Sequence, residues 1–70
     1  MRTITIGSRI KALRTQRRLT QEQLALVFGV TPQAVSRWEL ERSYPDLELL
    51  PVIANYFAVS TDFLLGLREQ

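Results

Sequence analysis

Residues 21–40, QEQLALVFGVTPQAVSRWEL, constrain the fold of this chain more than any other segment. Gly29 lies at its centre and can end a helix with a positive φ, because glycine has no Cβ. Thr31 is a good N-cap for a following helix, and Pro32 suits the first helical position, where a missing N–H costs nothing. The segment therefore predicts two short helices joined at a steep angle by a turn of three or four residues.

The apolar residues of this segment predict how the two helices pack. Leu24 and Phe28 are four residues apart and share one helical face. Ala25 is small and lets the second helix approach closely, while Val35 and Trp38 face back toward the first helix. The outer face of the second helix is then left with Pro32, Gln33, Ser36 and Arg37.

The whole chain is short and contains neither cysteine nor histidine. Its 70 residues allow one small domain that buries about 60% of its unfolded surface. The composition excludes disulfides, Cys/His zinc sites and histidine-based catalysis. No apolar run approaches a membrane span of ~20 residues, and no signal-peptide pattern is present. We therefore expect a cytoplasmic protein with no cofactor, no metal and no membrane partner.

Charge is distributed unevenly along the chain, although the net charge is only +2. Residues 1–37 contain seven basic residues and only Glu22 as an acid, whereas residues 38–70 contain two basic and six acidic residues. Such asymmetry indicates an end that faces a polyanion. The alternative is a basic helix that is simply solvated.

The rest of the chain predicts three more helices. One runs over residues 6–17, with Ile6, Ile10 and Leu13 as its apolar stripe and Thr5 as its N-cap. Within the two-helix segment described above, the first helix covers residues 21–28 and begins with a capping box between Thr20 and Gln23. The helix that completes the two-helix segment covers residues 32–40.

The C-terminal part is predicted as a loop over residues 41–46 and two helices. The first begins near Leu49, with Pro51 in its first turn, where proline is tolerated. The second covers residues 61–65, with Ser60 as its cap and Gly66 as its end. Residues 1–5 form an extension that is either a strand fragment or a disordered arm. The domain covers residues 6–66, and residues 67–70 form a tail.

Three segments, IGSRIKALR, LTQEQLALVFGVTPQAVSRWE and LLPVIANYFAVSTDFLLG, carry a resemblance to a known family. In this order and spacing, the chain resembles the lambda repressor-like helix-turn-helix proteins, the group of Cro, phage repressors and Xre-type regulators. The resemblance covers residues 6–66. It implies an all-α, compact five-helix domain. It also implies a sequence-specific regulator of transcription, a repressor, that binds double-stranded DNA and is not an enzyme.

In this family the third helix enters the major groove. The resemblance implies that Gln33 pairs with adenine, that Arg37 pairs with guanine, and that Ser36 reaches a base or a phosphate. Pro32 departs from family members with a polar residue at this position and offers only apolar contact. The residues that the resemblance assigns to the DNA backbone are Arg17, Arg18, Thr20, Gln21, Arg42, Ser43 and Tyr44.

Several of these residues have a plainer interpretation. Arg37 can be an ordinary surface arginine. Arg14 and Glu39 match a family ion pair that is structural if buried, and worth little if exposed. Trp38 can be a stacking platform for bases, but its spacing from Val35 favours the core. Phe28, Phe57 and Phe63 are likewise predicted core residues.

The family usually reads paired half-sites about 34 Å apart, which implies a palindromic operator and a homodimer on DNA. Leu64, Leu65 and Leu67 form an apolar cluster, some of which must pack under the first and fourth predicted helices. The remainder, with residues 43–50, provides a dimer contact or is only scattered surface leucine. No small-molecule ligand is expected. The competing function is a protein-interaction or dimerisation module of the same fold that does not bind DNA.

Overall fold

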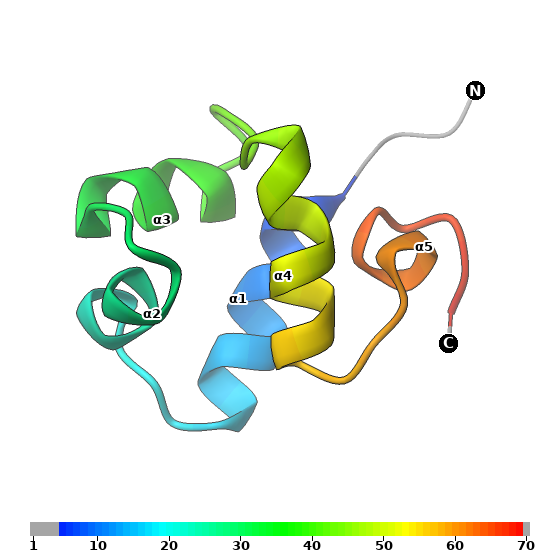
Figure 1. Cartoon of the computed structure of the whole chain (residues 1–70), viewed down its shortest axis with the longest axis horizontal. Helices are drawn as coiled ribbons and strands as arrows, with labels where there is room; N and C mark the ends of the chain where they lie inside the picture. Colours follow the sequence, from blue (N-terminus) through cyan, green and yellow to red (C-terminus); the bar gives the residue numbers. More distant parts are fainter. Residues whose placement is uncertain (1–4, 70) are drawn as a thin grey trace.

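The computed structural model describes residues 5–69, which fold into helices connected by turns and loops (Figure 1). The predicted all-α, five-helix architecture is confirmed over these residues. Residues 1–4, the main part of the predicted extension, lie outside the described region. In chain order the elements are α1 (Ile6–Gln16), α2 (Gln21–Phe28), α3 (Pro32–Glu39), the 3₁₀ turn η1 (Leu47–Leu49), α4 (Leu50–Tyr56) and α5 (Thr61–Leu64).

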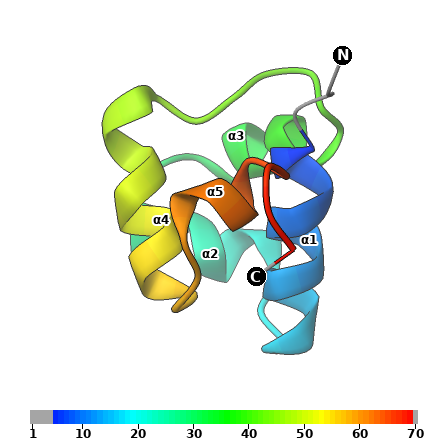
Figure 2. The same cartoon turned by 90° about the vertical axis from the view of Figure 1, so that its right-hand side faces the viewer.

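The helices surround a single apolar core to which every α-helix contributes. The α2–α3 pair lies at one end of the molecule and α5 at the other, with α1 and α4 between them (Figures 1 and 2). Trp38 is buried, as the spacing predicted, and Phe28 and Phe57 are buried with it. The buried apolar side chains are Ile6, Ile10, Leu24, Ala25, Phe28, Val35, Trp38, Ile53, Ala54, Phe57 and Leu64.

Phe63 is not among them, and its assignment to the core was wrong. Its ring is only partly buried and lies beneath the guanidinium of Arg9, 4.5 Å from ring centroid to Cζ. In the short α5 it is Leu64, the next residue, that is buried in the core.

Three of the predicted helix caps are present. The Thr20 hydroxyl accepts from the Gln23 amide and the Gln23 side chain accepts from the Thr20 amide, which completes the capping box. The Thr31 hydroxyl accepts from the Ala34 amide, and the Ser60 hydroxyl accepts from the Phe63 amide. These side chains satisfy helix N–H groups that have no partner inside the helix.

The predicted Thr5 cap of α1 is wrong. The Thr5 side chain makes no cap bond, and the Glu41 carboxylate accepts from the amides of Gly7 (3.3 Å) and Ser8 (3.0 Å) instead. Glu41 reaches these amides because the end of α3 lies directly against Gly7. A Cβ on Gly7 would lie 1.9 Å from the carbonyl oxygen of Trp38.

All five α-helices end in the same way, with a left-handed residue that reverses the chain. An amide then bonds back to the carbonyl five residues earlier, as from Val30 to Ala25 or from Val59 to Ala54. This cap explains why α1, α3 and α5 each stop one residue before their predicted ends, since Arg17, Leu40 and Leu65 belong to the caps. The left-handed residues are Arg18, Gly29, Glu41, Ala58 and Gly66.

Ala58 occupies one of these positions with φ of 58°, which strains an L-residue. We expect Ala58→Gly to raise the free energy of unfolding by roughly 0.5–1 kcal/mol, because relief of the strain exceeds the added entropy of the unfolded chain. Urea denaturation followed by circular dichroism measures this change.

Gly29→Ala is the matched control. Its φ is 68° and a Cβ there would meet no atom within 4 Å, so only backbone strain changes. It should lower stability by about 1 kcal/mol. A destabilised Ala58→Gly variant would contradict the prediction.

Candidate nucleic-acid interface

The outer face of α3 presents the four residues that the sequence assigned to base contact. Gln33 and Arg37 are exposed, and Pro32 and Ser36 are partly buried beside them. Val35 and Trp38 occupy the opposite face and anchor α3 to the core. α3 lies at the outer edge of the molecule (Figure 1).

The start of α2 provides backbone donors. The Gln23 amide is bonded to the Thr20 hydroxyl and the Leu24 amide to the Thr20 carbonyl. Among the described residues, the amides of Gln21 and Glu22 have no acceptor, as expected for the first turn of a helix. Together with the helix dipole, these N–H groups favour an anion at this end.

A buried ion pair joins α1 to the end of α3. Arg14 Nε donates to Glu39 Oε2 at 2.6 Å and Arg14 Nη2 donates to Glu39 Oε1 at 3.0 Å. The side chains are 12% and 3% exposed, so this is the structural version of the predicted pair. The hydrogen bond to Glu39 raises the pKa of Arg14 above its ordinary value. Because the pKa is raised in the folded state, the stability that the Arg14 charge contributes is fully present at any pH below that ordinary value.

The same pair organises the segment before α2. Arg14 Nη1 donates to the carbonyl oxygen of Leu19 at 2.7 Å. Gln21 Nε2 donates to Glu39 Oε1 at 3.0 Å. The side chain that the resemblance assigned to a phosphate is therefore already oriented by a buried carboxylate, which sequence reasoning did not foresee.

Arg17 contacts the end of α4. Its Nη1 donates to the carbonyl oxygen of Tyr56 at 3.0 Å, and its guanidinium lies over the rings of Tyr56 and Phe57. Arg17 thus caps the C-terminal end of α4. Its assignment to the DNA backbone stays a prediction. Arg18 is exposed in the same turn.

The loop after α3 brings further polar residues to the end of that helix. The Arg42 amide bonds to the Arg37 carbonyl, so the two arginines share the α3 cap. Arg42 and Tyr44 are exposed, and Ser43 is partly buried. These residues follow the last turn of α3 directly in the chain.

The three leucines of the predicted dimer cluster lie in different environments. Leu64 is completely buried, so its assignment to a dimer interface was wrong. Leu65 is partly buried and Leu67 is 42% exposed. Leu47, which the sequence did not single out, is 81% exposed. Leu65 lines an apolar cleft of about 330 Å³ together with Ile6, Tyr44, Pro45, Leu47 and Leu50.

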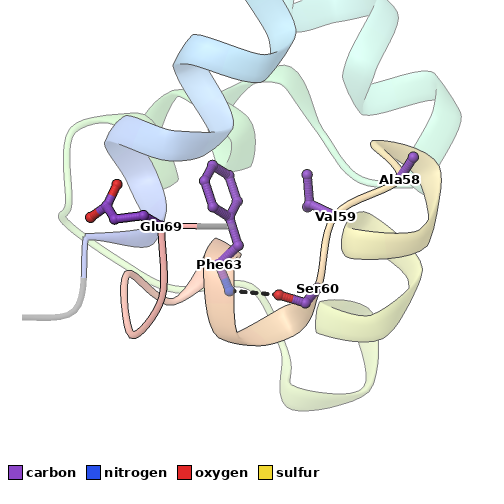
Figure 3. Close-up of a pocket in the computed structure, with 5 residues that line it drawn as sticks. All are labelled: Ala58, Val59, Ser60, Phe63 and Glu69. Carbon is purple, nitrogen blue, oxygen red and sulfur yellow. Dashed lines mark hydrogen bonds between the residues drawn. The ribbon is translucent and has the colours of Figure 1, made fainter.

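A second hollow, of about 410 Å³, lies beside α5 and is lined by Ala58, Val59, Ser60, Phe63 and Glu69 (Figure 3). The Ser60 hydroxyl is occupied in capping α5, and the Glu69 carboxylate lies 3.4 Å from Arg9 Nη2. The hollow therefore offers no converging set of reactive groups. No group of three metal-ligating side chains occurs between residues 5 and 69.

Comparison with known proteins gives the family. The family model described as "Helix-turn-helix" matches residues 10–64. A transcriptional activator of Enterococcus faecalis, BcrR, is 43% identical over 63 residues, which are 90% of this chain and 31% of that protein. The c2 repressor of Salmonella phage P22, solved with a synthetic operator, superposes with a TM-score of 0.82 at 32% identity over 90% of this chain and 96% of that chain. The chain belongs to the helix-turn-helix family of lambda repressor-like domains.

The fold also occurs inside an enzyme. Hydroxypropylphosphonic acid epoxidase from S. wedmorenis superposes with a TM-score of 0.78 at 26% identity, over 93% of this chain and 36% of that chain. The curated relatives are longer as well, and this chain spans between about a third and just over half of their length. None of the helices between residues 5 and 69 has the length and apolar character needed to cross a bilayer.

The ion pair gives a stability prediction. We expect Glu39→Gln to lower the free energy of unfolding by about 3 kcal/mol, because it leaves the Arg14 charge buried beside a neutral amide. Chemical denaturation of the purified variant measures the loss.

Glu48→Gln makes the same chemical change at an exposed position and should cost less than about 0.5 kcal/mol. If Glu39→Gln also lowered the free energy of unfolding by less than about 0.5 kcal/mol, the Arg14–Glu39 pair would contribute no more than a surface ion pair.

Proposed function

We propose that this chain is a sequence-specific, double-stranded DNA-binding domain of a transcription regulator that acts as a repressor. The observation that carries the proposal is the open face of α3, where Gln33 and Arg37 project from a helix anchored by Val35 and Trp38. The likeness to a repressor solved with its operator supports it. A domain of this kind represses by occupying a promoter, and it works in the cytoplasm without catalysis or cofactor.

In the proposed complex α3 lies in the major groove. Arg37 donates two hydrogen bonds to guanine O6 and N7, and Gln33 pairs with adenine N6 and N7. Ser36 reaches a base or a phosphate, and Pro32 makes apolar contact with a thymine methyl group. The free amides at the start of α2, with Thr20 and Gln21, hold one phosphate, and Arg42, Ser43 and Tyr44 contact the backbone beyond α3.

We further propose that two copies bind a palindromic operator. The apolar cleft supports this proposal, because Tyr44 and Leu47 expose large apolar surfaces at its rim and Leu65 lies within it. A self-complementary patch of this kind suits an interface with two-fold symmetry.

One observation favours a different role. The same fold forms part of an epoxidase, so it can serve as a domain of a larger protein whose reaction lies elsewhere. If this chain were such a module, Gln33 and Arg37 would be ordinary surface residues. Electrophoretic mobility shifts on duplexes selected from a random pool separate the two roles, since only a DNA-binding domain yields an enriched sequence.

The assignment of Arg37 to base recognition predicts a change in sequence preference. Arg37→Ala should weaken binding to the selected duplex by about 1–3 kcal/mol and relax the preference at one base pair, because a bidentate contact to guanine is lost. Fluorescence anisotropy on the selected duplex and its single-base variants measures both effects.

Arg68→Ala removes one positive charge from an exposed residue that follows α5 in the chain, and it serves as the control. It should leave the sequence preference unchanged. Identical selected sequences for Arg37→Ala and the wild type would argue against base contact by Arg37.

The dimer predicts a difference between one and two half-sites. Leu47→Lys places a charge on the proposed contact, so it should weaken binding to the palindrome while leaving binding to an isolated half-site unchanged. The expected loss on the palindrome is about tenfold or more. If Leu47→Lys bound the palindrome and the half-site as tightly as the wild type does, the dimer contact would lie elsewhere.

A further inference from the structure

The buried Glu39 carboxylate has a second partner besides Arg14. That partner is the side chain of Gln21, the first residue of α2. We propose that Glu39 is a positioning residue that orients the Gln21 amide to donate a hydrogen bond to a DNA phosphate. This inference rests on the proposed DNA-binding function and assigns to the ion pair a role beyond stability.

The geometry determines which way the Gln21 amide faces. Glu39 Oε1 accepts from Gln21 Nε2 at 3.0 Å and from Arg14 Nη2 at 3.0 Å, while Oε2 accepts from Arg14 Nε at 2.6 Å. An ionised carboxylate accepts hydrogen bonds but cannot donate them. The NH₂ group of Gln21 must therefore face Glu39, and its carbonyl oxygen must face away.

This orientation leaves one donor for an anion. Nε2 carries two hydrogens, and Glu39 takes only one of them. Among the described residues the second has no acceptor, and Gln21 is only partly buried, so an outside group can approach it. The unpaired amides of Gln21 and Glu22 belong to the same helical turn. The side chain and the backbone can thus donate to one phosphate.

The support for Gln21 is itself held in place. Arg14 Nη1 bonds to the carbonyl oxygen of Leu19, just before the Thr20 cap, while Glu39 holds Gln21 just after it. The ion pair is therefore hydrogen-bonded to the residues on both sides of the N-cap of α2. A long, flexible side chain at the surface is held in one orientation before DNA arrives, which lowers the entropy lost on binding.

A double-mutant cycle on DNA affinity tests the proposal. Gln21→Met keeps a side chain of similar length and leaves the Arg14–Glu39 pair intact, but it removes the donor. It should weaken binding to a short random-sequence duplex about tenfold. The slope of affinity against salt should stay unchanged because no charge is lost, whereas Arg42→Ala should reduce that slope by about one.

Glu39→Gln completes the cycle, at a temperature where circular dichroism shows the variant to be folded. It should weaken duplex binding about threefold or more in the wild-type background and cause no further loss in the Gln21→Met background. Equal losses in the two backgrounds would overturn the proposal, since Glu39 would then act only through stability.

Nitrogen-15 NMR of the DNA-free protein gives a second test. The chemical shifts of the two side-chain NH₂ protons of Gln21 should differ widely in the wild type, and the difference should become smaller in Glu39→Gln. The Gln23 signals should not move, because its side chain is bonded to Thr20 through its oxygen. Unresponsive Gln21 signals in a protein that binds the duplex would overturn the positioning role alone, whereas a wild type that binds no duplex would defeat the proposed function itself.

Discussion

The buried pair of Arg14 and Glu39 is the interaction on which the α2–α3 end of this domain depends. It spans 25 residues of sequence and joins α1, the start of α2 and the end of α3 through four hydrogen bonds. In so small a domain the apolar core alone leaves little margin of stability. The buried charges are tolerated because nearly all the hydrogen-bond donors and acceptors of the two side chains are satisfied. The pair also defines the orientation of α2 against α3.

Local patterns in the sequence were enough to predict most of the fold. The capping box at Thr20, the caps at Thr31 and Ser60, and the glycine turn at Gly29 each depend on residues within four positions of one another. The burial of Val35 and Trp38 followed from helical spacing in the same way. Such features are encoded locally, and a single sequence is sufficient to read them.

Most of the features that were missed depend on contacts between distant segments. Glu41 caps α1 from 33 and 34 residues away, and Arg17 caps α4 across 39 residues. The burial of Leu64 depends on how α5 packs against the core, which its leucine-rich sequence does not reveal. The outward position of Gln33 and Arg37 was predictable from periodicity, whereas the bond between Gln21 and Glu39 required the fold.

The contact of Gly7 with the end of α3 has a further consequence. With Glu41 bonded to the start of α1 and the Trp38 carbonyl pressed against Gly7, α3 is fastened at its C-terminal end. Its N-terminal end is fastened by the turn at Gly29 and the cap at Thr31. A helix held at both ends keeps its place in the scaffold when its exposed side chains are changed. Under the proposed function, the preference for a DNA sequence can therefore change by substitutions on the outer face of α3, while the scaffold stays the same.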